Sequence, residues 1–207
     1  MKKTIAVIGA AKKMGSTISF GLAAAAYCVL VTDDIEKSLT PFFGALPILL
    51  AKIRFKVPYA DVRIVFSARE ACWEADIIIL ADESDEQAGV ARRIKDVVTQ
   101  KIVIGVTDAL GTGVNGQEKA ASSNTIEELA RLLPYSKIVH LFTPSSPVDS
   151  ARLQDSETHP VVLVGGEDQE AVSTVMLLAQ EVGLNPLIAD NLNKSNAGGD
   201  DVRNRRS

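Results

Sequence analysis

Two glycines and a following acidic residue have the spacing of a phosphate- and ribose-binding site. Gly9 follows a short apolar run, and Gly15 opens a segment with helical periodicity. Backbone N–H groups in such a turn and at a helix N-terminus bind pyrophosphate oxygens. Asp33 ends the next apolar run, where a carboxylate accepts hydrogen bonds from a ribose diol. We therefore predict a dinucleotide site formed by Asp33 and the turn residues Gly9, Ala10, Ala11, Lys12, Lys13, Met14 and Gly15.

The turn departs from the usual glycine-rich fingerprint at Lys12. Its spacing fits G-x-x-G-x-x-G, and Lys12 occupies the place of the middle glycine, which normally lets the backbone approach phosphate. A lysine there either adds its own ammonium group to the phosphate site or pushes the ligand away. From the sequence both alternatives remain open, as does a turn that binds nothing.

The elements around this turn form a β-α-β pattern. Residues 4–8 and 28–32 are apolar runs typical of strands buried on both faces of a parallel sheet. Between them Ile18, Leu22 and Ala25, at i, i+4 and i+7, predict an amphipathic helix. The small residues around Leu22 allow that helix to lie close to the sheet.

The alternation of buried strands and amphipathic helices continues to about residue 190. It predicts an α/β fold, a Rossmann-like doubly wound parallel sheet in three α/β/α layers, with strand order 3-2-1-4-5-6. Residues 1–190 form this domain, and the polar residues 191–207 are expected to be a disordered tail. Later strands are expected at 62–66, 76–80, 101–106, 137–142, 161–164 and 184–189, the last at an edge because of Pro186.

Helix boundaries follow from caps and prolines. Asp168 and Gly183 bound one helix, and Thr125 with Glu128 forms a capping box that opens another. Pro47, with Pro41 before it, predicts a broken helix within residues 35–56. The Thr143–Pro147 segment is not expected to continue the strand before it.

The carboxyl ends of two central strands supply the remaining candidate site residues, because ligands bind there in such sheets. Ala81 and Asp82 follow strand 76–80, and Thr107 and Asp108 follow strand 101–106. Asp85 and Glu86 begin the next helix, which carries Val90, Ile94, Val97 and Val98 on one face. Carboxylates at that end are favourable against the helix dipole, so we interpret these two as capping residues.

The composition excludes several classes of protein. The 207-residue chain is 46% hydrophobic and 23% charged, with a formal net charge of −4. An acidic chain lacks the basic field that gathers nucleic-acid phosphates, and no apolar run approaches the ~20 residues of a membrane span. The first apolar run is too short for a signal peptide. Cys28 and Cys72 suggest neither a disulfide framework nor a zinc site, so we expect a cytoplasmic protein without a metal.

Several segments, in order along the chain, resemble one family, the small NADP oxidoreductases that use the deazaflavin coenzyme F-420. The resemblance covers nearly the whole chain to Asp190. It implies an NAD(P)-binding Rossmann domain that transfers a hydride between nicotinamide and a second redox partner. The matching segments are the Gly9–Gly15 turn, Ala75–Ala81, Lys101–Leu110, Glu127–Pro134, strand 137–142, and Val161–Asp168 with the helix after it.

The sequence differs from that family where the cofactor is selected. Family members follow the second strand with a Ser-Arg pair that holds the 2′-phosphate of NADP, whereas this chain has Thr32 and Asp33. A carboxylate repels that phosphate, so Asp33 favours NAD while the resemblance favours NADP. Asp82 and Glu83 replace a Val-Pro pair, and Thr143 replaces an Asn.

His140 is the candidate proton donor for a carbonyl substrate. Hydride transfer to a flavin-like ring needs positioning more than acid–base chemistry, whereas carbonyl reduction needs a proton donor, most often a histidine. The run His140–Pro144 is similar to the His-Phe-Phe-Asn-Pro segment of 3-hydroxyacyl-CoA dehydrogenases, whose histidine is catalytic. A buried structural histidine is the alternative, and His159 is expected in an exposed loop.

Two classes of function remain open. One is an NAD(P)-dependent oxidoreductase that acts on a flavin-like or small carbonyl partner. The other is a nucleotide-binding or sensing module without turnover. The expected partners are a dinucleotide and an unidentified redox substrate, without nucleic acid or membrane, and a homo-oligomer is left open.

Overall fold

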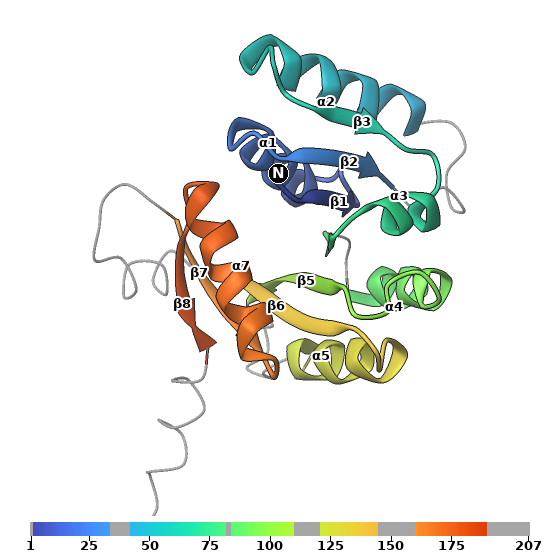
Figure 1. Ribbon diagram of the computed structural model, residues 1–207, viewed down its shortest axis with the longest axis vertical. Coiled ribbons are helices and arrows are strands. Elements are labelled where there is room, and N and C mark those ends of the chain that lie inside the picture. The colour runs from blue at the N-terminus through green and yellow to red at the C-terminus, as the bar shows by residue number, and fades with distance from the viewer. Residues whose placement is uncertain (1, 34–41, 82–83, 110–120, 145–159, 190–207) are drawn as a thin grey trace, which may run out of the picture.

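The buried apolar runs form one eight-stranded sheet in the computed structural model (Figure 1). The structure describes residues 2–33, 42–81, 84–109, 121–144 and 160–189; at 42–45, 84–85, 108–109, 121–126 and 143–144 it describes the backbone alone. The strands are β1 (Thr4–Ile8), β2 (Cys28–Thr32), β3 (Val62–Ile64), β4 (Ile77–Leu80), β5 (Ile102–Ala109), β6 (Lys137–Pro144), β7 (Val161–Gly166) and β8 (Asn185–Ile188).

The strand order is β3-β2-β1-β4-β5-β6-β7-β8, which confirms the predicted 3-2-1-4-5-6 order. β1 to β6 are parallel to one another, whereas β7 is antiparallel to β6 and β8 is parallel to β7. β8 is an edge strand, as Pro186 predicts, because proline has no N–H group to donate to a further neighbour.

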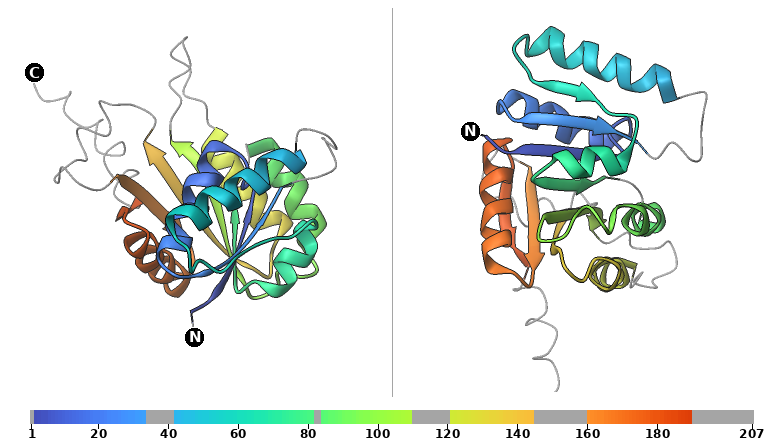
Figure 2. Two further views of the ribbon diagram at one scale, coloured as in Figure 1. Left: turned by 90° about the horizontal axis from the view of Figure 1, so that it is seen from above. Right: turned by 45° about the vertical axis from the view of Figure 1, so that its right-hand side comes forward.

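Helices cover both faces of the sheet, which confirms the three-layer architecture. Alternate strand residues such as Ile5 and Ile79 pack with α1, α2 and α7, and the intervening ones such as Ile78 and Leu80 pack with α3, α4 and α5. In Figure 2 (right), α7 lies on one side of the sheet and α4 and α5 on the other. The helices are α1 (Lys13–Ala24), α2 (Phe42–Lys56), α3 (Ala68–Glu74), α4 (Ser84–Ile94), α5 (Ala121–Leu132) and α7 (Gln169–Glu181).

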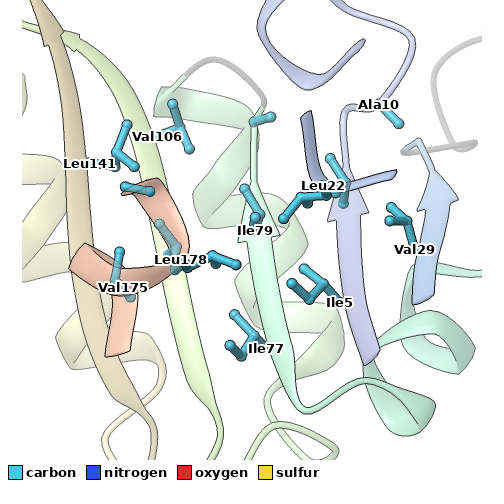
Figure 3. Packing of buried hydrophobic residues seen from close by; sticks show 14 of the residues in the cluster. Ile5, Ala10, Leu22, Val29, Ile77, Ile79, Val106, Leu141, Val175 and Leu178 are labelled. Carbon is cyan, nitrogen blue, oxygen red and sulfur yellow. The ribbon is translucent and has the colours of Figure 1, made fainter. Parts of the chain in front are cut away.

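The larger core lies between the sheet and the α1, α2 and α7 layer. Figure 3 shows Ile5, Leu22, Ile79 and Leu178 gathered there from two strands and two helices. Leu22 is 1% exposed, as its position on the apolar stripe of α1 predicts. Full burial of such a side chain contributes about 1.5–3 kcal/mol, so this core fixes α1 and the turn before it on the sheet.

Three predicted element boundaries were wrong. α2 is continuous through Pro47, because a proline in the second turn removes one backbone donor without preventing later turns from forming. α5 begins at Ala121, so Thr125 lies inside the helix and does not open it as a capping box. β6 continues to Pro144, since Thr143 and Pro144 still pair with the long strand β5.

The predicted ends of α7 are confirmed, whereas the predicted extent of α4 was wrong. The Asp168 carboxylate accepts a hydrogen bond from the Ala171 N–H (2.8 Å) and caps α7, and Gly183 follows the helix with a φ of 83°. α4 ends at Ile94, so Val97 and Val98 lie beyond it, although both are buried as predicted. The predicted tail at 191–207 lies outside the described residues.

Candidate dinucleotide-binding site

The turn between β1 and α1 requires glycine at both ends. Gly9 has a φ of 81°, a left-handed backbone conformation that other residues adopt only with strain. A Cβ added at Gly15 would lie 2.1 Å from the Gly9 carbonyl oxygen and 2.9 Å from the Ala10 Cα. The helix therefore starts directly against the end of β1, the close approach that a dinucleotide-binding turn needs.

The amino end of α1 presents backbone donors. Lys12 is the N-cap residue, and its side chain makes no capping hydrogen bond. The first helical bond runs from the Ser16 N–H to the Lys12 carbonyl (2.8 Å), so the N–H groups of Lys13, Met14 and Gly15 have no acceptor within the helix. Donors in this arrangement, at the positive end of the helix dipole, suit an anion.

Asp33 lies beside the turn, as predicted, but also holds it. The Asp33 carboxylate accepts a hydrogen bond from the Ala11 N–H (3.3 Å), and the neighbouring Thr32 carbonyl accepts one from the Ala10 N–H (3.1 Å). The Asp33 residue is 5% exposed. A carboxylate has about four acceptor positions, and the bond to Ala11 uses one of them.

The turn and Asp33 meet at the point where the direction of the chain connections reverses. β1 lies between β2 and β4, and the helix after β1 covers the opposite face from the helix after β4. The Ala81 N–H donates to the Ile8 carbonyl (2.9 Å), so this predicted residue lies next to the end of β1. Ligands of open α/β sheets bind at such a switch point. Asp82 lies outside the described residues.

An ion pair crosses this edge of the sheet. The Lys12 ammonium group, in the turn before α1, contacts the Glu86 carboxylate in the first turn of α4. Glu86 is therefore more than the capping residue of our interpretation, because it also neutralises the charge that distinguishes this turn from an all-glycine fingerprint.

Thr107 and Asp108 lie on β5, which runs to Ala109, and so do not follow the strand as predicted. Thr107 is 9% exposed, and its hydroxyl has no hydrogen-bond partner among the described residues. At Asp108 the described backbone pairs with Thr143 of β6. The Gln87 side-chain amide donates to the Val106 carbonyl (2.8 Å) beyond the last β4–β5 pair, Leu80 with Gly105. Gln87 thus supports β5 where β4 no longer lies beside it.

His140 is buried in the middle of β6. It is the fourth of eight residues of β6 and is 1% exposed; among the described residues neither ring nitrogen has a hydrogen-bond partner. Burial lowers the pKa of His140 to about 4, which holds the ring neutral at pH 7. A Cβ added at Gly105 would lie 3.2 Å from the His140 ring and 3.1 Å from the Gln87 amide oxygen. These observations favour the structural role, and the catalytic role stays a prediction.

Sequence reasoning missed two residues at this edge, Glu86 as a partner of Lys12 and Gln87 as a support of β5. Gln87 had a signal, since it stands three residues before Val90 on the apolar stripe of α4, where a polar side chain needs a buried partner. Glu86 had none, because its partner is 74 residues away in the chain.

Solved structures of reductases have a fold similar to that of this chain. An imine reductase from Myxococcus stipitatus in complex with NAD+ has a TM-score of 0.62 at 16% identity, over 95% of this chain and 60% of that chain. The pyrroline-5-carboxylate reductase of Coxiella burnetii has a TM-score of 0.61 at 20% identity, over 96% and 64%. The chain has a Rossmann fold. The pyrroline carboxylate reductase of Plasmodium falciparum with NADP bound also has this fold, with a TM-score of 0.58 at 15% identity over 94% and 61%.

This chain spans about three fifths of the length of these reductases. No protein-family model matches it. In the described part of the chain, no helix has the length and apolarity of a membrane span, and no group of three or more His, Cys, Asp and Glu side chains has the arrangement of a metal site.

Proposed function

We propose that the protein is an NAD(P)-dependent oxidoreductase. The observation that carries this proposal is the meeting of the Gly9–Gly15 turn, the open amino end of α1 and the Asp33 carboxylate at the switch point of the sheet. The adjacent N–H donors and carboxylate acceptor support binding of a phosphate next to a ribose, as in a dinucleotide.

Each candidate residue has a role in this proposal. The N–H groups of Lys13, Met14 and Gly15 bind the pyrophosphate, and Asp33 binds the adenosine ribose and favours NAD over NADP. Gly9, Ala10 and Ala11 shape the turn beside them. We assign Ala81, after β4, and Thr107, on β5, to the nicotinamide side of the site. The same role is proposed for Asp108, of which the backbone alone is described, and for Asp82, which lies outside the described residues.

The second substrate accepts or donates a hydride at the nicotinamide, which supplies the redox chemistry when bound. The family resemblance supports a deazaflavin, and the reductase neighbours support a small imine or carbonyl compound. No described residue selects between them. A deazaflavin or flavin makes little demand for a protein proton donor, which agrees with the burial of His140.

The test has two steps. Calorimetric titration of the purified chain with NADH and NADPH should show binding of at least one, with NADH the tighter ligand. NADH oxidation at 340 nm is then followed with a panel of deazaflavins, flavins, imines and small carbonyls. Binding of neither nucleotide at millimolar concentration would overturn the proposal.

A nucleotide-binding module without turnover is the second candidate. Burial lowers the pKa of His140 to about 4, which removes the candidate general acid for a carbonyl substrate at neutral pH, so this module competes chiefly with reduction of a flavin-like partner. Binding of NADH without oxidation by any member of the panel would support this candidate over the enzyme.

A further inference from the structure

The Lys12–Glu86 ion pair lies at the edge of the sheet where a dinucleotide is proposed to bind. Lys12 precedes α1, on one face of the sheet, and Glu86 belongs to α4, on the other. Their side chains meet over the carboxyl ends of β1 and β4. We propose that Glu86 is a built-in competitor for the cofactor pyrophosphate, and that binding exchanges the Glu86 carboxylate for a phosphate oxygen at the Lys12 ammonium group.

The position of Lys12 makes this exchange possible. Lys12 is the N-cap of α1, so its side chain starts beside the N–H groups of the first turn that are expected to bind the pyrophosphate. Its backbone is extended, with a φ of −74° and a ψ of 161°, a conformation any residue adopts. The lysine at the place of the middle glycine therefore costs no backbone strain, and only the direction of its side chain has to change.

The charge of the Glu86 carboxylate opposes binding of a phosphate at Lys12 unless the ion pair opens. A carboxylate held beside the phosphate site repels an anionic ligand and occupies its cationic partner. The Lys12 and Glu86 side chains are 41% and 31% exposed, and an ion pair with this much solvent contact is weak enough to open. The pair therefore lowers the affinity for the dinucleotide without blocking the site. This inference rests on the proposed function, because it assigns a regulator to the same site.

The variant Glu86→Gln tests the exchange. It removes the competing charge and keeps the shape of the side chain, so we expect roughly threefold to tenfold tighter binding of NADH at low salt. Glu74→Gln is the matched control. Glu74 pairs with Arg63 at 3.1 Å with similar side-chain exposure, but it ends α3 just before β4 starts, at the opposite edge of the sheet. Its substitution should leave NADH affinity unchanged.

A double-mutant cycle separates exchange from simple repulsion. Lys12→Ala should weaken NADH binding, and Glu86→Gln should give a smaller gain in that background than in the wild type. An equal gain in both backgrounds, or unchanged or weaker binding by Glu86→Gln alone, would overturn the inference. If the inference is overturned in this way but the wild type binds NADH, the proposed function still stands. If neither NADH nor NADPH binds to any of the proteins, the proposed function and this inference are both rejected.

Discussion

At the scale of single residues, Asp33 combines a proposed role in binding with an observed role in the structure of the turn. It is the expected ribose acceptor, and it also holds the turn through the Ala11 N–H. Its burial, with 5% exposed, places the negative charge where solvent screens it poorly. Such a charge discriminates strongly against an added phosphate group.

Replacement of Asp33 should therefore change cofactor preference. For Asp33→Ser we expect the preference for NADH over NADPH to fall by about 1–3 kcal/mol, the usual size of a charge-assisted contact. Titration of wild type and variant with both cofactors measures this change. Asp33→Asn is the control, because it removes the charge but keeps an acceptor for the Ala11 N–H. Wild-type binding of NADPH at least as tight as that of NADH would contradict our interpretation of Asp33.

At the scale of elements, the contact between β1 and α1 determines the geometry of the turn. The helix begins against the backbone of Gly9 and Ala10, with no space for a Cβ at Gly15. The glycine in α4 is different, because a Cβ at Gly89 would meet only the Arg93 guanidinium, at 3.8 Å. The same substitution should thus have opposite effects in the two helices.

We expect Gly15→Ala to lower the free energy of unfolding by about 3 kcal/mol or more and to abolish dinucleotide binding, because the backbone of the turn must shift. Gly89→Ala should raise the free energy of unfolding by about 0.5–1 kcal/mol, since alanine is the better helix former. Urea unfolding curves of both variants measure these effects. A Gly15→Ala protein with wild-type stability would show that the turn has no such close contact.

At the scale of the whole molecule, three polar residues are buried between the sheet and the α4 and α5 layer. Gln87, Thr107 and His140 are each at most 9% exposed, although the surrounding core is apolar. Burial of the neutral imidazole is tolerable, whereas burial of its charged form is not. Global stability must then depend on the protonation of His140.

The sign of this dependence follows from the lowered pKa of His140, about 4 against an ordinary 6.5. Between these values the unfolded chain binds the proton more readily, so the contribution of His140 is present above pH 6.5 and is lost as the pH falls. We expect a loss of about 2 kcal/mol between pH 7.5 and pH 5. Urea unfolding at both pH values should show that the free energy of unfolding of His140→Leu falls by about 2 kcal/mol less than that of the wild type. If the free energy of unfolding of wild type and His140→Leu fell equally with pH, the histidine would titrate normally.

The sequence alone determined the order of the elements and the glycine-bounded turn between β1 and α1. Apolar runs and helical stripes indicate which residues are buried, and two glycines indicate backbone geometry, so the 3-2-1-4-5-6 order and the close approach of α1 to β1 at the Gly9–Gly15 turn were predictable. The tertiary structure alone decided that Lys12 meets Glu86, and that His140 is buried in mid-strand. Local patterns depend on neighbours within a few residues. These contacts instead depend on which distant elements pack together and on how far β5 and β6 remain paired.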